Sequence, residues 1–511
     1  MRLTGPVLER VPAALFLVLL SCSLVLLPGV SQYEPRLAHA APGDPYLWSV
    51  GGPGADEVRH LAVDAVGSVF VAGMFSATID LDPGTEVTSL TSAGSTDLFL
   101  AKYAPDGQVL WAFGVGGPGI DRVYQVAVDP FGHVYLAGSF ADEVDFAPGE
   151  AVAAVRAGGE RDGFVAKYTS AGELLWVTPL NPLGDDAVLA LVLDRNGNPI
   201  AAGLAGSALV PPADAEGRAD VRRGDAFVMR LDGDGRLTWS AILPTRSEGV
   251  DPVGVAINAL GEIYLASSYT GSVRVSVGSG FVDHTSKGGT DLLLLKIGSS
   301  GNLIWSKSFG GEENVYPGPG GLALDAAGNV LLTGSFAGEL DVSGDGATVL
   351  ETKGQGDLFL ITLTPDGSVR WAAGIGGEDL DGGLRVAADA AGYVYVAGWS
   401  ASDLPFGTGE DGQVLMGRRQ PGGTDALIAK YTPAGQLAWA HSFGGSMTGP
   451  GQSSLASTVV VDPWGDVLLA GRFFGTDVNF DPRGGVAVLN SVGQSDAFVA
   501  RFGPDGSLLR R

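Results

Sequence analysis

The feature that most constrains the fold of this chain is a tryptophan that returns at spacings of 63 to 68 residues along 511 residues. An aspartate that opens an apolar stretch recurs with the same period, and so does an aspartate or asparagine that closes another stretch. The tryptophans are Trp48, Trp111, Trp176, Trp239, Trp305, Trp371 and Trp439. The opening aspartates are Asp97, Asp162, Asp225, Asp291, Asp357, Asp425 and Asp496. The closing residues are Asp64, Asp129, Asp194, Asn258, Asp325, Asp389 and Asp462. Each series has seven members, which predicts seven repeats.

Each repeat can be divided into four short strands. The stretch Asp97–Trp111, DLFLAKYAPDGQVLW, is an apolar strand, a Pro-Asp-Gly turn and a second strand that ends in tryptophan. A short first strand such as Leu61–Val63 and a second strand such as Val134–Gly138 precede it in the unit. Turns rich in Asp-Gly and Gly-Asn suit hairpins. Four antiparallel strands per repeat are typical of propeller blades, so we predict an all-β fold, a single seven-bladed β-propeller over residues 41–511.

The two ends of the array indicate how the ring closes. The strand 46–50 contains the first tryptophan but has no other strands of a unit before it. The last unit has Arg510 where the tryptophan should stand. We therefore predict that residues 46–50 supply the outer strand of the last blade, and we expect the tail after Gly506 to contribute little.

The repeat pattern resembles the SBBP family of bacterial seven-bladed β-propeller repeats. The resemblance lies in Val126–Asp129, Val134–Gly138, Asp97–Tyr103 and Asp82-Pro83-Gly84, with a weaker echo at Asn479–Pro482. It covers about residues 46–510 and implies a bacterial protein that is secreted or displayed on the cell surface. The family provides no catalytic residues to carry over.

The first 40 residues have the composition of an export signal. Arg2 and Arg10 precede the apolar run Pro12–Pro28, and Ala38-His39-Ala40 is a suitable cleavage motif. We expect a signal peptide cleaved after Ala40 and an extracellular, cell-surface or periplasmic protein. Two alternatives stay open: the run remains as a membrane anchor, or Cys22 in Leu19–Cys22 is lipidated. Cys22 is the only cysteine, so the propeller has no disulfide.

The charge of the chain restricts its partners. The formal net charge is −26, and a surface this acidic repels phosphate backbones and anionic lipid heads. We expect no nucleic-acid partner, membrane contact only through an uncleaved or lipidated N-terminus, and a monomer whose partner is a protein or a glycan.

A residue that recurs in every blade holds the blade together, whereas a functional site should lie where blades differ. This rule predicts an architectural role for the recurring aspartates, for the tryptophans, and for the Lys or Arg that stands five residues after an opening aspartate. We predict no catalytic and no cofactor-binding residue. For metals, Asp341, Ser343 and Asp345 have the alternate spacing of a calcium loop, but Thr352 stands where the acidic twelfth ligand belongs. Calcium is the candidate ion for this segment, and a polar turn without an ion is the alternative.

The connections between strands differ most from blade to blade, and loops on a rigid scaffold often bind ligands. The binding candidates are Glu312, Glu313, Tyr316, Phe406, Arg418 and Arg419. From these observations we predict an exported, non-enzymatic binding or interaction module that uses a loop face. The alternatives are an enzyme, for instance one acting on carbohydrate, with a site at the central channel, and a purely structural surface protein.

Overall fold

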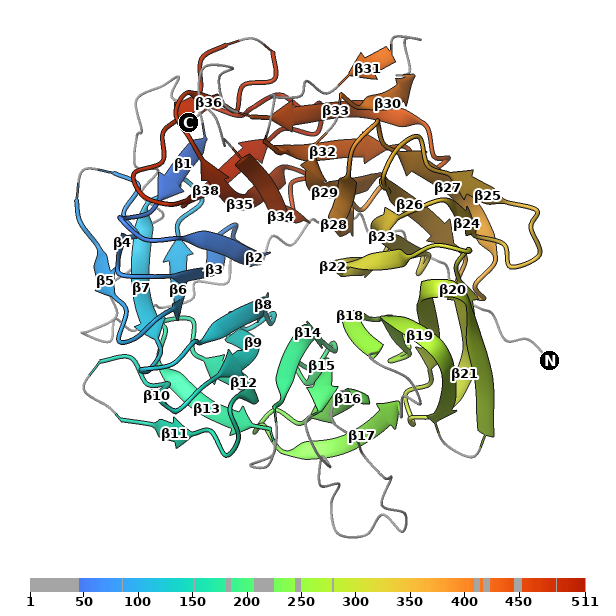
Figure 1. Cartoon of the computed structure of the whole chain (residues 1–511). Coiled ribbons are helices and arrows are strands. Elements are labelled where there is room, and N and C mark those ends of the chain that lie inside the picture. The colour runs from blue at the N-terminus through green and yellow to red at the C-terminus, as the bar shows by residue number, and fades with distance from the viewer. Residues whose placement is uncertain are drawn as a thin grey trace, which may run out of the picture. The chain divides into compact units, whose positions relative to one another are not determined.

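The chain forms a seven-bladed β-propeller, as the repeats predict (Figure 1). The computed structural model describes residues 46–84, 86–149, 152–180, 185–205, 225–243, 250–277, 280–401, 403–408, 414–416, 423–444, 453–483 and 485–510. Within them, seven four-stranded antiparallel sheets surround a central channel. No helix in this part of the chain is long and apolar enough to cross a membrane. The expected signal segment 1–40, with Cys22, lies outside the described residues.

The strands of each blade follow the order of the chain from the channel outward, except in the last blade. The innermost strands are β2 (Glu57–Val63), β8 (Arg122–Val128), β14 (Ala187–Leu193), β18 (Val250–Ile257), β22 (Val315–Leu324), β28 (Asp381–Ala388) and β34 (Ser453–Val461). The second strands are β3 (Val69–Phe75), β9 (Val134–Phe140), β15 (Pro199–Ala205), β19 (Ile263–Val277), β23 (Val330–Phe336), β29 (Val394–Ser400) and β35 (Val467–Phe474). The third strands are β6 (Asp97–Tyr103), β12 (Asp162–Tyr168), β16 (Asp225–Leu231), β20 (Gly280–Ile297), β26 (Asp357–Leu363), β32 (Asp425–Tyr431) and β38 (Asp496–Phe502). The outer strands of six blades are β7 (Val109–Val115), β13 (Leu174–Pro179), β17 (Leu237–Leu243), β21 (Leu303–Phe309), β27 (Val369–Ile375) and β33 (Leu437–Phe443).

The outer strand of the last blade comes from the other end of the described chain. Strand β1 (Leu47–Val50) pairs antiparallel with β38, with Leu47 opposite Ala500 and Val50 opposite Ala497. The tail after Gly506 takes a larger part than expected. Leu508 forms a bridge with Phe502, and the carbonyl of Leu509 accepts a hydrogen bond of 2.7 Å from the Tyr46 N–H.

The inner strands are longer than the sequence suggested, because each one continues past a register break. In β2, for example, the ladder with β3 shifts between Val58 and His60, and the strand begins four residues before Leu61. A register break occurs at the corresponding place in the other six inner strands. Such a bulge adds one residue to one strand and changes the direction of its side chains.

The core lies between neighbouring blades, because the sheets bury both faces. All seven residues of β3 and of β9 are buried. One apolar cluster joins Phe70 and Leu100 of the first blade to Leu136 and Phe164 of the second. This explains why strands such as DLFLAKY lack the apolar–polar alternation of a half-exposed sheet.

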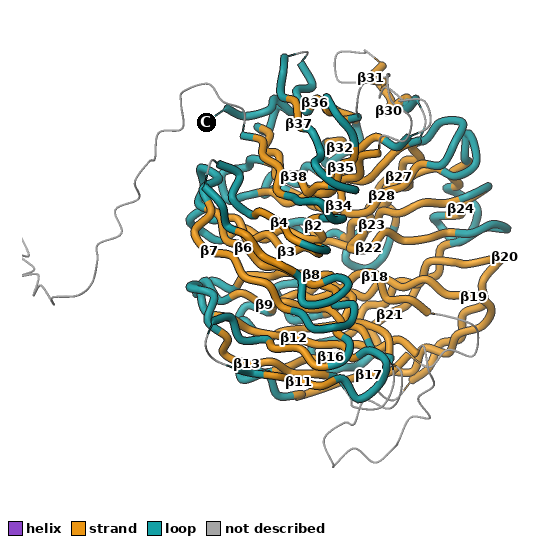
Figure 2. The backbone as a smooth tube through the Cα atoms, turned by 60° about the vertical axis from the view of Figure 1, so that its left-hand side comes forward, coloured by secondary structure: helices purple, strands orange, loops and turns teal. Residues whose placement is uncertain are grey.

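Second and third strands are joined on one side of the ring, where the described residues add a small two-stranded sheet to five blades. These pairs are β4 (Thr78–Asp80) with β5 (Ser89–Thr91), β10 (Glu143–Asp145) with β11 (Ala154–Arg156), β24 (Glu339–Asp341) with β25 (Val349–Glu351), β30 (Pro405–Thr408) with β31 (Val414–Met416), and β36 (Val478–Asn479) with β37 (Val488–Leu489). In the fourth blade β19 and β20 extend instead as one long hairpin (Figure 2). The crossings from outer to inner strands meet these small sheets, as at the bridge of Gly116 with Asp145. We call this side the loop face.

Candidate functional site

The central channel is the place where the inner strands of all seven blades meet. Each inner strand pairs with a neighbour on one side only, so its free edge presents backbone N–H and C=O groups to the channel (Figure 1). Each inner strand begins at the loop face, and its bulge lies near that end of the strand. The bulges therefore lie at the mouth of the channel, and this geometry selects which side chains reach it.

The residue after each bulge has no constant identity. It stands four places before the recurring aspartate or asparagine that closes the inner strand. The seven residues are His60, Gln125, Ala190, Gly254, Gly321, Arg385 and Thr458; in β22 the register break is longer, from Pro317 to Leu322, and Gly321 lies within it. Three large polar side chains thus enter from three blades, while glycine or alanine in three others leaves room for them.

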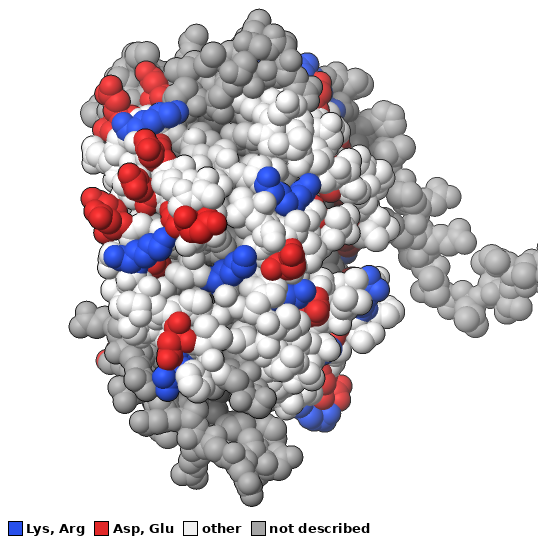
Figure 3. Space-filling model, turned by 90° about the vertical axis from the view of Figure 1, so that its right-hand side faces the viewer, with Lys and Arg blue, Asp and Glu red and all other residues white. Residues whose placement is uncertain are grey.

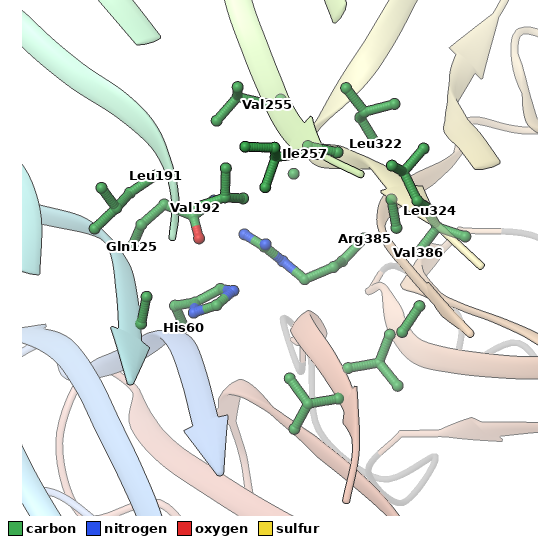
Figure 4. A pocket seen from close by; sticks show the side chains of 18 of the residues that line it. His60, Gln125, Leu191, Val192, Val255, Ile257, Leu322, Leu324, Arg385 and Val386 are labelled. Carbon is green, nitrogen blue, oxygen red and sulfur yellow. The ribbon is translucent and has the colours of Figure 1, made fainter. Parts of the chain in front are cut away.

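Those three side chains line one cavity in the channel. The cavity has a volume of about 550 Å³ and touches all seven inner strands. Its other side chains are mainly aliphatic, among them Val192 and Ile257. The guanidinium of Arg385 extends into the middle of the cavity, with His60 and Gln125 on the side toward which it points (Figure 4).

A second, smaller cavity of about 180 Å³ forms the mouth above it. The bulge residues Arg59, Tyr124, Leu189, Leu384 and Ser457 line it, together with Arg385, which borders both cavities. Arg472 of β35 and Glu57 of β2 also contribute. Glu57 accepts an ion pair from Arg59 at 2.8 Å and another from Arg472 at 3.4 Å.

Arg385 lacks such a partner. Its Nη2 lies 3.4 Å from the carbonyl oxygen of Pro319, and its enclosed Nε has no hydrogen-bond partner. No described carboxylate forms an ion pair with it. Burial lowers the pKa of Arg385 to about 10, so the guanidinium still carries its charge at neutral pH. Gly320 makes the space, because a Cβ there would lie 2.3 Å from the Arg385 Cζ.

His60 is neutral at physiological pH. Burial lowers its pKa well below the usual 6.5, and the charge of Arg385 lowers it further. The Val126 N–H approaches Nδ1 at 3.4 Å and donates to it. With Nδ1 as acceptor, the imidazole carries its proton on Nε2.

The candidates chosen from the sequence lie away from this channel. Glu312 and Glu313 are exposed on the crossing before β22, and Tyr316, half exposed, pairs with Ser335 near the start of that strand. None of the three lines either cavity. Phe406 belongs to β30, but its side chain is outside what the structure describes, and Arg418 and Arg419 lie outside the described residues altogether.

The calcium-loop candidate forms a hydrogen-bonded turn next to β24. Asp341 accepts from the N–H groups of Ser343 and Gly344 and from Lys287 Nζ at 2.7 Å. Asp345 accepts from the Ala347 N–H. Among the described residues no group of three or more His, Cys, Asp or Glu side chains is placed to hold a metal ion. Calcium binding at Asp341, Ser343 and Asp345 stays a prediction.

The recurring residues have the architectural contacts expected of them. The indole Nε1 of Trp111 donates to the Ser170 carbonyl of the next blade, and Trp439 donates to Pro504 in the same way. Arg230 pairs with Asp194, and Arg501 with Asp462. Five opening aspartates, those of blades whose preceding residues are described, accept the N–H four residues earlier, as Asp97 does from Ala93 at 2.7 Å. These contacts hold turns and neighbouring blades together.

The channel residues could have been found from the sequence by applying the rule of difference to the inner strands. The position four residues before the closing aspartate or asparagine is Ala or Gly in three blades, Thr in one, and His, Gln or Arg in the other three. The bulge that turns this position toward the channel has no obvious sequence marker.

Comparisons with known proteins do not place the chain in a family. No family model matches. The chain is 20% identical to an uncharacterized WD repeat-containing protein of Acanthamoeba polyphaga mimivirus, over 89% of this chain and 38% of that protein. It is 31% identical to the regulatory protein FlaEY of Caulobacter vibrioides, over 29% of this chain and 15% of that protein. The matches thus span well under two thirds of either relative.

Solved structures resemble the chain at low identity. A polysaccharide lyase described as an ulvan lyase aligns with a TM-score of 0.43 and 10% identity, covering 92% of this chain and 98% of that one. A protein of unknown function from Bacteroides caccae aligns with a TM-score of 0.35 and 12% identity, covering 67% and 89%. The SBBP resemblance stays a prediction.

Proposed function

We propose that the protein is an exported, non-enzymatic binding module of bacterial SBBP type that receives its ligand at the mouth of the central channel. The observation that carries the proposal is that His60, Gln125 and Arg385, which stand at the bulges of three different blades, line one cavity on a rigid ring. The mouth opens on the loop face, so the connecting loops surround the same entrance. This refines the use of a loop face expected from the sequence.

The dimensions and the lining of the channel support binding. Its volume of about 550 Å³ falls in the range of roughly 300–1,000 Å³ usual for small-molecule sites. Aliphatic walls with a few convergent polar groups are also typical of such sites. The free strand edges add donors and acceptors, so a glycan or a peptide end finds hydrogen-bond partners on all sides.

A second candidate is an enzyme with its centre in the channel. One observation favours it: His60 is a neutral imidazole in the channel cavity, and a neutral imidazole can serve as a general base. The carboxylate pair that many carbohydrate-active enzymes use does not appear in the cavity, because Glu57 at the mouth is the one acidic side chain in its described lining.

The test is a thermal-shift screen of the purified protein against glycans, small metabolites and peptides, repeated with a blocked channel. Val192→Trp places an indole in the cavity, and Leu110→Trp is the matched control on the outer strand β7, where the side chain is 45% exposed. We expect a ligand whose shift is lost in the first variant and kept in the second. A shift that survives the block places binding elsewhere. Turnover of the ligand supports the enzyme, and no shift by any compound supports the structural alternative.

A further inference from the structure

Positive charge gathers at the channel mouth of an otherwise acidic protein. Arg59, Arg385 and Arg472 line the mouth against the single carboxylate of Glu57, although the whole chain has a formal net charge of −26. On the side of the ring in Figure 3, by contrast, basic and acidic side chains are interspersed. The concentration at the mouth is therefore local, and it opposes the overall charge of the protein.

Of these three arginines, Arg385 is the one whose charge no described carboxylate neutralises. Glu57 forms ion pairs with Arg59 and Arg472, whereas no described carboxylate pairs with Arg385. A charge withdrawn from water without a counter-ion is costly, and proteins retain such groups chiefly where a ligand completes the pair. The guanidinium also presents planar N–H donors suited to two-point contact with a carboxylate, sulfate or phosphate.

Other donors at the mouth are free as well. Arg59 Nε, Arg385 Nε and Ser457 Oγ are enclosed and have no hydrogen-bond partner. Their residues all line the mouth. Buried polar groups in native proteins almost always find a partner. A ligand with several acceptor oxygens would supply partners for these three atoms together.

We propose that the channel mouth binds a small hydroxylated organic anion whose carboxylate, sulfate or phosphate is held by Arg385, with Arg59 and Arg472 at the rim. The hydroxyl groups of the ligand meet the free edges of the inner strands below. This inference rests on the proposed function, which places a ligand in the channel, and adds its chemical class.

The test uses matched probes in isothermal titration of the purified protein. D-Glucuronate and D-glucose have the same ring and differ by the carboxylate, and inorganic sulfate supplies an anion without a hydroxylated body. The variants are Arg385→Gln, which removes the charge, and Arg385→Lys, which retains it. Arg236→Gln is the control, because Arg236 is a highly exposed arginine on a distant turn.

We expect glucuronate to bind at millimolar or lower concentration and more tightly than glucose. Arg385→Gln should weaken glucuronate binding roughly tenfold to 100-fold, the usual effect of losing charge-assisted hydrogen bonds. Arg385→Lys should weaken it less, and Arg236→Gln should leave it unchanged. Added salt should weaken glucuronate binding but not glucose binding.

The outcomes separate this inference from the proposed function. Glucose and glucuronate could instead bind equally well, with binding lost in Val192→Trp but unchanged in Arg385→Gln. That result would contradict anion recognition by Arg385 and would still support a binding site in the channel. If sulfate binds as tightly as glucuronate, the claim that the ligand has a hydroxylated body is wrong. If neither probe binds wild-type protein, the inference is wrong, and the compound screen decides the channel separately.

Thermal melts show whether a loss of binding in the Arg385 variants comes from a less stable fold. Because Arg385 has no carboxylate partner in the described chain, Arg385→Gln should melt at or above the wild-type temperature. A marked fall would mean that Arg385 supports the fold, and the comparison of Arg385→Lys with Arg236→Gln would then decide whether its charge binds the anion.

Discussion

Contacts between blades depend on single residues that meet two requirements at once. The ring of Trp371 packs on Gly435, in the turn between the third and outer strands of the next blade. Gly435 has a φ of +84°, and a Cβ there would lie 2.7 Å from the Trp371 Cδ2. Glycine is therefore required twice, for the left-handed backbone and for the close approach of the indole.

The variant Gly435→Ala tests the close approach at this contact. The matched control is Gly328→Ala, because Gly328 has a φ of +81° but its Cβ would meet nothing nearer than 3.8 Å. Both substitutions should lose about 1–2 kcal/mol from backbone strain. Gly435→Ala should lose about 1–3 kcal/mol more, since the indole must move. Chemical denaturation measures the unfolding free energy of both variants. Equal losses would show that the Trp371 indole moves away from the new Cβ at no cost in stability.

At the scale of strands and crossings, buried carboxylates lie at the junctions between blades. Asp121 stands just before β8, where its carboxylate accepts the N–H groups of Gly117 at 2.8 Å and Ala141 at 3.0 Å. Burial raises its pKa to about 6; the two backbone hydrogen bonds oppose the rise, and Asp97 adds to it. Burial likewise raises the pKa of Asp56, beside Asp496, and of Asp425 to about 7.

Stability should therefore depend on pH through Asp121. A raised folded pKa means that the protonated form is favoured in the fold, so its stabilisation is complete only below the unfolded pKa of 3.8 and is lost as pH rises through about 6. The difference in unfolding free energy between wild type and Asp121→Asn should change by about 1.4 kcal/mol between pH 5 and 8.

Two comparisons make that measurement specific. Burial lowers the pKa of His60, His284 and His441, and their stabilisation is lost as pH falls below about 6.5. Both proteins keep these histidines, so their contribution cancels in the difference. Glu160→Gln removes an exposed carboxylate and should leave the pH profile unchanged. Parallel profiles for wild type and Asp121→Asn would contradict the expectation.

For the molecule as a whole, closure of the ring joins the two ends of the described chain. Tyr46, Trp48 and Val50 are 3–4% exposed, and they pack in one cluster with Tyr103 of the first blade and Leu468 of the last. Strand β1 thus completes the seventh sheet and also touches the first blade. A ring closed in this way has no exposed outer gap through which the first and last blades could separate.

Two truncated proteins test this closure. A chain that starts at residue 51 lacks β1, whereas one that starts at residue 46 retains it. Burial of three large side chains contributes about 5 kcal/mol or more, so the shorter protein should melt far below the longer one and less cooperatively. Calorimetry of the two proteins measures the difference. Similar melting curves would mean that β38 alone closes the last blade.

The sequence by itself determined the number of blades, the four-strand repeat and the architectural role of the tryptophans and aspartates. These features depend on local turns and on contacts with the adjacent blade. Each therefore recurs at a fixed spacing that can be counted. The place of residues 46–50 could be predicted for the same reason, since a strand was left over at one end and missing at the other.

Only the tertiary structure decided where the candidate site lies. His60, Gln125 and Arg385 are far apart in the chain, and each stands in an inner strand that otherwise resembles its equivalents. A one-residue bulge turns them toward the channel, and ring closure brings them into one cavity. Bulge register and closure depend on pairing among all the blades, a non-local property that no single repeat records.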